Sequence, residues 1–296
     1  MKSLGLMQGV EEGKGEEMKR KTILAVQLAL SGLLISGLPR LAGAAVFEDA
    51  TWSQNAGNND RLYTYSDDEN EFRITDSYQA TAILVNNGAQ VEINATTGSN
   101  TATDNYTGRT NAWWGAWVND SSTLTMNAAQ NNEITGMGIR DTAVYANNGG
   151  QIHLEADKNI LKGVNSAVSV VTPEANIEVI GRSGNEISIS SQSDSSTKDA
   201  VFVNQGTTTI KALNGDNVIS STDPDNEDKA VYAKFGAEAS IIAEKGSNVF
   251  SSTHIALNAS GRDKDHPGEL REGHLLVSAE KDNVMTVSTS AAGEGV

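Results

Sequence analysis

A short pattern that recurs along the chain constrains its fold more than any single motif. Seven five-residue segments begin with Ala or Gly, carry apolar residues at their second and fourth positions, and end in Asn in four cases. They start 24 to 33 residues apart and are Ala82–Asn86, Gly115–Asn119, Ala143–Asn147, Ala167–Val171, Ala200–Asn204, Ala230–Lys234 and Ala256–Ser260. Alternation with a period of two is typical of strands, and a repeat of roughly 20–50 residues is typical of a solenoid.

Two further strand-like stretches follow most of these segments. The second stretch alternates in the same way, as in Val91 with Ile93 and Ile152 with Leu154. The third opens directly after an Asn, and these residues are Asn132, Asn159, Asn185, Asn217, Asn248 and Asn283. Three short strands per coil, separated by turns of Gly, Asn and Ser, predict an all-β solenoid whose coils bury their apolar faces against each other.

The Asn at the fifth position of the first strand is the candidate structural element of the stack. Asn tolerates left-handed turn geometry, and its side-chain amide can bond to an identical Asn one coil away. We therefore predict a structural Asn ladder formed by Asn86, Asn119, Asn147 and Asn204.

The third position of the first strand is the candidate ligand-binding surface. Alternation turns this position outward, and stacked coils would align its aromatic residues, Trp117, Tyr145, Phe202 and Tyr232, with Trp113 and Trp114 nearby. Exposed rings in a row can bind the glycans or proteins of a host or neighbouring cell surface. The alternative is that inserts or a neighbouring sheet cover the row.

The N-terminal region has the three parts of a cleavable signal peptide. Lys19–Lys21 is basic, Ile23–Leu38 is apolar, and Ala42 and Ala44 are small residues placed for cleavage ahead of Ala45. A transmembrane anchor is the weaker interpretation, because the apolar run is short. We predict export into the periplasm with cleavage after Ala44.

Residues 1–17 precede this signal and contain acidic residues, which do not fit the basic start of a signal peptide. We therefore expect Met18 to be the true start, so that residues 1–44 comprise an extension and the signal peptide. Removal of this segment takes six basic and four acidic residues from totals of 22 and 38, which changes the net charge from −16 to −18.

Composition excludes several kinds of chemistry. The chain has no Cys, which rules out disulfides, thiolate metal sites and a thiol nucleophile. Its acidic charge argues against a nucleic-acid partner, since phosphates require clustered Lys and Arg. The four His residues show no metal-ligand spacing, and no nucleophile elbow is present. We therefore predict no catalytic residues, no metal and no cofactor.

Taken together, the signal peptide, the Cys-free body and the degenerate three-strand coils resemble the passenger domain of a bacterial autotransporter (type V secretion). The resemblance implies a right-handed parallel β-helix that a C-terminal outer-membrane β-barrel translocator carries to the cell surface. Residues 45–81 lack the repeat and are rich in aromatics, so we assign them as an N-terminal cap. Residues 82–296 are then the passenger repeats, and we expect them to be truncated at the C-terminal end, because no barrel pattern precedes Val296.

The function that this resemblance implies is non-enzymatic. We expect an adhesin or surface-interaction protein at the cell surface and outer membrane, or secreted. Two alternatives are a polysaccharide-active lyase or hydrolase, which other β-helices include, and a structural stalk that presents a downstream domain. Clustered carboxylates in a groove would favour the enzyme, whereas an outward aromatic row without them would favour adhesion.

Overall fold

The computed structural model describes residues 44–48, 52–55, 62–74, 81–104, 114–138, 141–189, 198–221, 228–260 and 272–288. Within these ranges the regular elements are all strands, and each strand pairing is parallel. A search of the same ranges finds no helix long and apolar enough to cross a membrane.

The smaller of the two sheets has eight strands in chain order. It consists of β2 (Trp52–Asn55), β5 (Ile83–Asn86), β8 (Trp114–Val118), β11 (Thr142–Ala146), β13 (Ser166–Val170), β15 (Asp199–Asn204), β18 (Lys229–Lys234) and β21 (Ile255–Ser260). Seven of these strands, from β5 onward, coincide with the seven predicted segments to within one residue at their starts, so the prediction of the repeat is confirmed.

The larger sheet has 15 strands and folds over the other sides of the coils. Its strands are β1 (Ala44–Glu48), β3 (Leu62–Asp67), β4 (Glu69–Ile74), β6 (Gln90–Ala95), β7 (Asn100–Asp104), β9 (Thr123–Ala128), β10 (Asn131–Gly136), β12 (Gln151–Gly163), β14 (Asn176–Ile189), β16 (Thr207–Ala212), β17 (Asp216–Ser221), β19 (Glu238–Ala243), β20 (Asn248–Ser252), β22 (His274–Ala279) and β23 (Asn283–Val287). In β12 and β14 a single strand runs through the corner that elsewhere separates two strands.

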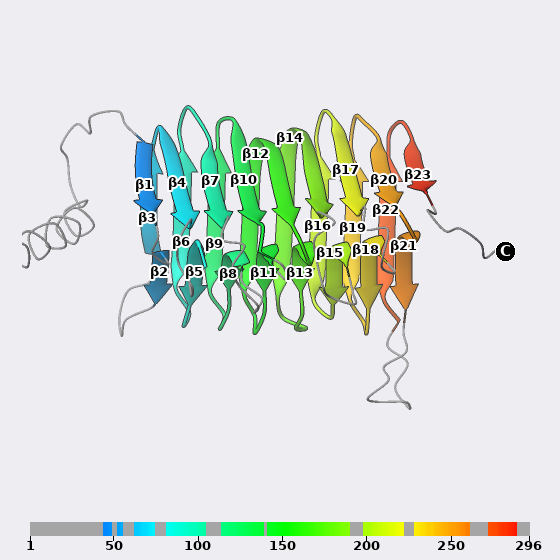
Figure 1. Ribbon diagram of the computed structural model, residues 1–296, viewed down its shortest axis with the longest axis horizontal. Helices are drawn as coiled ribbons and strands as arrows, with labels where there is room; N and C mark the ends of the chain where they lie inside the picture. The colour runs from blue at the N-terminus through cyan, green and yellow to red at the C-terminus, as the bar shows by residue number, and fades with distance from the viewer. Residues whose placement is uncertain are drawn as a thin grey trace, which may run out of the picture. The chain divides into compact units, whose positions relative to one another are not determined.

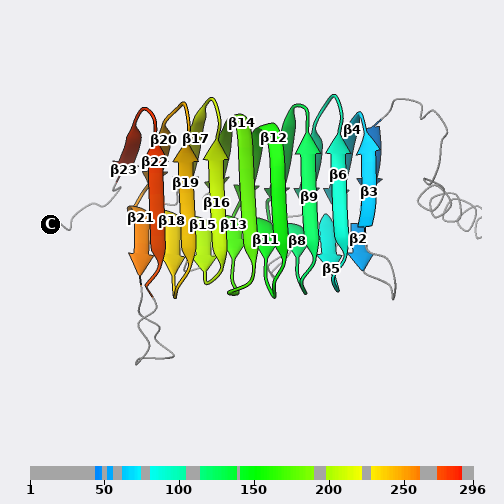
Figure 2. The same ribbon diagram turned by 180° about the vertical axis from the view of Figure 1, so that it is seen from behind.

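Each coil therefore contains one strand of the smaller sheet and two strands of the larger sheet. In the coils of β12 and β14, the two halves of that one long strand replace the two strands of the larger sheet. Figure 1 shows β4, β7 and β10 side by side along one side of the stack, and Figure 2 shows β6 and β9 along the opposite side. Because every strand pairs with its counterpart in the next coil, the chain forms a β-solenoid, as the repeat predicted.

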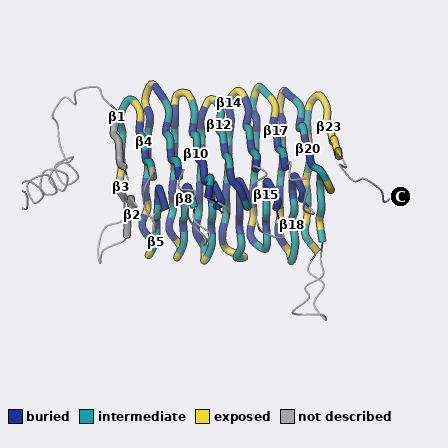
Figure 3. Tube along the Cα trace, in the orientation of Figure 1, coloured by how far each residue is buried: buried dark blue, intermediate teal, exposed yellow. Residues whose placement is uncertain are grey.

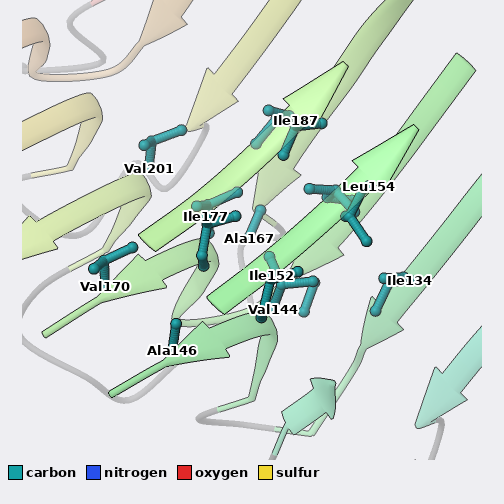
Figure 4. Packing of buried hydrophobic residues seen from close by; sticks show 14 of the residues in the cluster. Ile134, Val144, Ala146, Ile152, Leu154, Ala167, Val170, Ile177, Ile187 and Val201 are labelled. Carbon is teal, nitrogen blue, oxygen red and sulfur yellow. The ribbon is translucent and has the colours of Figure 1, made fainter. Parts of the chain in front are cut away.

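The core consists of the inward positions of all three strands. Figure 3 shows buried residues alternating with less buried ones along the strands, while exposed residues gather at the turns. Figure 4 shows Ile152 and Leu154 of β12 near Val144 of the smaller sheet and Ile177 of the next coil, and all four are buried. The predicted inward residues are confirmed, and their modest size fits the narrow space between facing sheets.

A continuous Asn ladder runs through the corner between the second and third strands of each coil. The side-chain amide of each Asn donates to the side-chain oxygen of the Asn in the next coil at 2.7–3.1 Å. The members of this ladder are Asn70, Asn100, Asn132, Asn159, Asn185, Asn217, Asn248 and Asn283. Seven of them, all but Asn283, are buried. Asn suits this place because its amide supplies two donors and an acceptor on a short side chain.

The prediction that the Asn residues at the fifth position of the first strand form a ladder is wrong. In the part of the chain that the structure describes, the side-chain oxygens of Asn86, Asn119 and Asn204 are buried without a hydrogen-bond partner, and that of Asn147 accepts from Trp117 instead. The physical reason is the turn that follows the strand. In the turn after Asn86, the next two residues, starting with Asn87, have φ of 55° and 77°, so they adopt the left-handed geometry rather than Asn86 itself.

The strands nearest the N-terminus continue the stack. β2, β3 and β4 pair in register with β5, β6 and β7, so coil pairing begins before residue 82. The assignment of residues 45–81 as a cap stays a prediction. Ala44 and Ala45 are the first residues of β1, opposite Glu69 and Asn70. The rest of the proposed signal, with Met18 and Ala42, lies outside the described residues.

Candidate functional site

The outward third positions of the smaller sheet form a straight column. Strand register places them opposite one another in the order Leu84, Trp117, Tyr145, Ser169, Phe202, Tyr232 and Asn258. Ser169 is buried, and the other six are partly exposed. The predicted alignment of Trp117, Tyr145, Phe202 and Tyr232 is confirmed, and we call these seven residues the aromatic column.

The rings of the aromatic column form two groups separated by Ser169. Trp114, at the start of β8, joins the first group, with its ring centroid 4.3 Å from that of Trp117 and 5.1 Å from that of Tyr145. The second group is Phe202 and Tyr232, whose centroids are 6.0 Å apart. Such distances are those of attractive aromatic pairs, so each group forms a preorganised apolar surface. Trp113, which was predicted to lie beside them, is outside the described residues.

Polar contacts hold several of these rings in place. The Trp117 indole Nε1 donates to the side-chain oxygen of Asn147 at 3.1 Å. The Tyr232 hydroxyl and the Ser260 hydroxyl are 3.1 Å apart. Burial raises the pKa of the Tyr145 phenol above its ordinary value of 10, so this ring presents a neutral hydroxyl. Hydrogen bonds therefore hold Trp117 and Tyr232, one ring in each group of the column.

Two lysines accompany the second group of rings. The Lys234 ammonium lies 4.9 Å from the Phe202 ring centroid and 5.5 Å from that of Tyr232. The Lys229 ammonium lies 4.9 Å from the Tyr232 centroid. These are cation–π distances, so positive charge is concentrated at this part of the column although the whole chain is acidic.

A hollow of about 270 Å³ opens where Ser169 interrupts the column. A small side chain there leaves empty the space that an aromatic ring fills in the neighbouring coils. The residues that line it come from four successive strands of the smaller sheet and the turns beside them, and they are Trp114, Thr142, Tyr145, Asn165, Ser166, Ser169, Val171, Asp199 and Phe202. The hollow thus combines aromatic walls with a polar floor.

The carboxyl group of Asp199 is the unusual member of that floor. Asp199 is only 1% exposed, and its Oδ1 accepts no hydrogen bond from the described residues. The nearest cation, the Lys229 ammonium, is 3.7 Å from Oδ1, which is an ion-pair distance longer than a hydrogen bond. Burial raises the pKa of Asp199 from 3.8 to about 7, although Lys229 and Lys234 act in the opposite direction. By contrast, the buried Asp228 accepts from Ser, Thr and backbone donors.

Charged residues on the outer face of the larger sheet pair with one another. The His153 Nδ1 lies 2.8 Å from a carboxylate oxygen of Glu178, and the Lys158 ammonium donates to Glu186 at 2.9 Å. The bond from Lys158 lowers the pKa of the Glu186 carboxyl. Within the described part of the chain, no group of three His, Asp or Glu side chains is placed to hold a metal ion.

Sequence reasoning found the aromatic column but missed the hollow. The interruption at Ser169 was visible in the aligned third positions, and it is the signal that could have located the hollow. Nothing in the sequence marks Asp199, because its burial depends on its neighbours in adjacent coils.

Comparison with protein-family models, with curated proteins and with solved structures found no match for this chain.

Proposed function

We propose that this chain is an autotransporter-type passenger, exported through the periplasm to the cell surface and outer membrane or secreted. It acts there without catalysis, as an adhesin or surface-interaction protein. The proposal includes the right-handed sense of the β-helix and the cleavable signal peptide. The right-handed sense is supported by Figures 1 and 2: in Figure 1 the stack advances from left to right while the nearer strands β4, β7 and β10 point downward, and Figure 2 shows β6 and β9 on the opposite side pointing upward. A C-terminal β-barrel translocator is the partner that this mode of export requires.

The observation that carries the proposal is the aromatic column on one outer face of the stack. Aromatic rings that are partly exposed, in contact and fixed by hydrogen bonds offer contact area at low entropy cost. Such a surface suits the glycans or proteins of a host or neighbouring cell.

The described carboxylates favour binding over hydrolysis. Glycoside hydrolysis ordinarily requires two carboxyl groups on either side of the bond that is cut. Among the described residues that line the hollow, Asp199 supplies one carboxyl group. The carboxylates of Glu178 and Glu186 lie on the other sheet and are paired with His153 and Lys158. These pairs leave the polysaccharide-active enzyme without a specific supporting observation.

The test compares the intact chain with Trp117→Ser and Tyr145→Ser on an array of immobilised glycans and cell-surface proteins. Leu84→Ser is the matched control, because Leu84 occupies the same column without a ring. We expect each aromatic variant to bind about tenfold more weakly, and the control to bind like the unaltered chain. Circular dichroism and thermal unfolding verify folding. Unchanged binding by both folded aromatic variants would contradict the proposal, and so would loss of folding in both, because the rings would then be structural.

A further inference from the structure

The hollow at Ser169 has the size of a site for one sugar ring. Pockets for drug-sized ligands occupy roughly 300–1,000 Å³, and this hollow, at about 270 Å³, is slightly smaller. It is open to solvent along the outer face of the sheet, between the ring of Tyr145 and the ring of Phe202 in the coils on either side. Its volume therefore suits a single six-membered ring at the end of, or within, a longer chain.

The walls have the chemistry that recognises the apolar face of a sugar. Trp114 and Tyr145 are in contact on one side, with their centroids 5.1 Å apart, and Phe202 forms the other side. A pyranose ring presents C–H groups on its faces and hydroxyl groups around its edge. The flat rings can pack against those C–H groups, while the edge points to the floor and to solvent.

Polar side chains form the floor of the hollow. Asp199 lines the hollow, and its Oδ1 is paired with the Lys229 ammonium at 3.7 Å, which is longer than a hydrogen bond, so this buried oxygen accepts no hydrogen bond from the described residues. Thr142, Asn165 and Ser166 place further polar side chains around it.

The charges around the hollow favour a neutral ligand. A carboxylate or sulfate on the sugar would meet the Asp199 carboxyl, and the nearby Lys229 ammonium is already paired with that carboxyl. An amino group would compete with the Lys229 ammonium, which already lies 3.7 Å from Asp199. A neutral hydroxyl avoids both conflicts.

We propose that this hollow binds one neutral pyranose ring of a glycan, packed against Trp114, Tyr145 and Phe202 and hydrogen-bonded to the polar floor. The inference rests on the proposed function, because it names the ligand class of the same surface. It adds a defined subsite within the column, whose specificity comes from its polar lining and from the space that Ser169 leaves.

The experiment titrates the purified full chain with the methyl glycosides of glucose, galactose and mannose. Binding is followed by tryptophan fluorescence, since Trp114 forms a wall, and by saturation-transfer NMR of the glycoside. At least one glycoside is expected to bind saturably, with a Kd of about 1 mM, as suits a ligand of this size. Absence of binding by all three would overturn the inference.

Two variants locate the binding. Ser169→Phe fills the hollow by continuing the column, and we expect it to weaken binding at least about tenfold. Glu186→Gln is the control, because Glu186 lies on the outer face of the larger sheet and does not line the hollow, and its affinity should stay within about twofold. If Ser169→Phe fails to fold, Phe202→Ser removes one wall instead and should weaken binding similarly. Unchanged affinity in a folded hollow variant would overturn the inference.

Two further measurements complete the test: binding of charged sugars, and binding of Trp117→Ser to the array of glycans and cell-surface proteins. Glucuronate and glucosamine should bind more weakly than the best neutral glycoside, and tighter binding of either would overturn the assignment to a neutral ring. Trp117→Ser separates this inference from the proposed function, because Trp117 lies in the column but outside the lining of the hollow. Weaker array binding by Trp117→Ser without saturable glycoside binding by the unaltered chain would overturn only the present inference. Saturable glycoside binding, with array binding unchanged in the aromatic variants, would overturn only the proposed adhesive role of the column.

Discussion

The buried Asn ladder provides the sharpest test of what stabilises this stack. Asn159 stands in its middle and is fully buried. Its side-chain nitrogen donates to Asn185 and to the carbonyl of Ile180, both at 2.9 Å, and its side-chain oxygen accepts from Asn132 at 3.1 Å. Replacement by Ala removes all three bonds at once and leaves their partners in a dry corner of the coil.

The magnitude follows from these three bonds. Each hydrogen bond contributes about 1 kcal/mol net, and a buried partner left unsatisfied adds roughly 1–3 kcal/mol. Asn132 keeps two other acceptors, the carbonyls of Met126 and Glu155, so its nitrogen is not orphaned. The side-chain oxygen of Asn185 loses the bond from Asn159. We therefore expect Asn159→Ala to lower the free energy of unfolding by about 3–5 kcal/mol.

Two matched variants make the comparison specific. Asn86→Ala alters a residue whose side-chain oxygen has no partner, so its effect should stay within about 1 kcal/mol. Asn283→Ala alters the last member of the ladder, which is exposed and accepts one bond from Asn248. Its effect should be about 1 kcal/mol.

Urea unfolding followed by circular dichroism measures the three effects. Hydrogen exchange then locates them, because stability in a solenoid is carried by neighbouring coils. Asn159→Ala should reduce amide protection in β10, β12 and β14, with little change in β20. The reasoning is refuted if Asn159→Ala destabilises the chain no more than Asn86→Ala, or if protection falls equally along the whole stack.

The remaining predictions concern one buried carboxyl and one tight corner. Because the pKa of Asp199 is raised from 3.8 to about 7 on folding, the folded state holds this proton more tightly, and stability should fall by roughly 4 kcal/mol as pH rises between these values. Asp199→Asn should remove that fall, which urea midpoints across the pH range would reveal; a parallel fall in the variant would contradict the assignment. At Gly163 an added Cβ would clash with the backbone carbonyl oxygen of Ser166, so Gly163→Ala should destabilise by about 3 kcal/mol or more in thermal unfolding. Gly88→Ala, at φ +77° with open space around it, should cost only about 1–2 kcal/mol, and equal effects would rule out the steric reason.

Periodicity was sufficient to predict the repeating unit and the inward residues. Alternation with a period of two decides which side chains of a strand share a face, so Ile152, Leu154 and Val144 could be assigned to the core without coordinates. The same rule placed Trp117 and Tyr145 on the outward face and in one column, because the same position of successive coils pairs in register.

Periodicity was insufficient at the corners. The sequence carries two sets of Asn with similar spacing, one closing the first strand and one opening the third. Asn159 turns inward where the chain bends between two strands of the larger sheet, whereas Asn86 stands just ahead of two left-handed residues. The direction of a side chain at a bend depends on backbone dihedral angles that a pattern of residue types does not specify.

The sequence by itself determined the strands, the core and the aromatic column of this protein, because each depends on local alternation repeated from coil to coil. Only the tertiary structure decided the Asn ladder, the hollow at Ser169 and the buried state of Asp199. These depend on contacts between residues roughly 25–35 positions apart in the chain, whose distances and burial are fixed only when the coils stack.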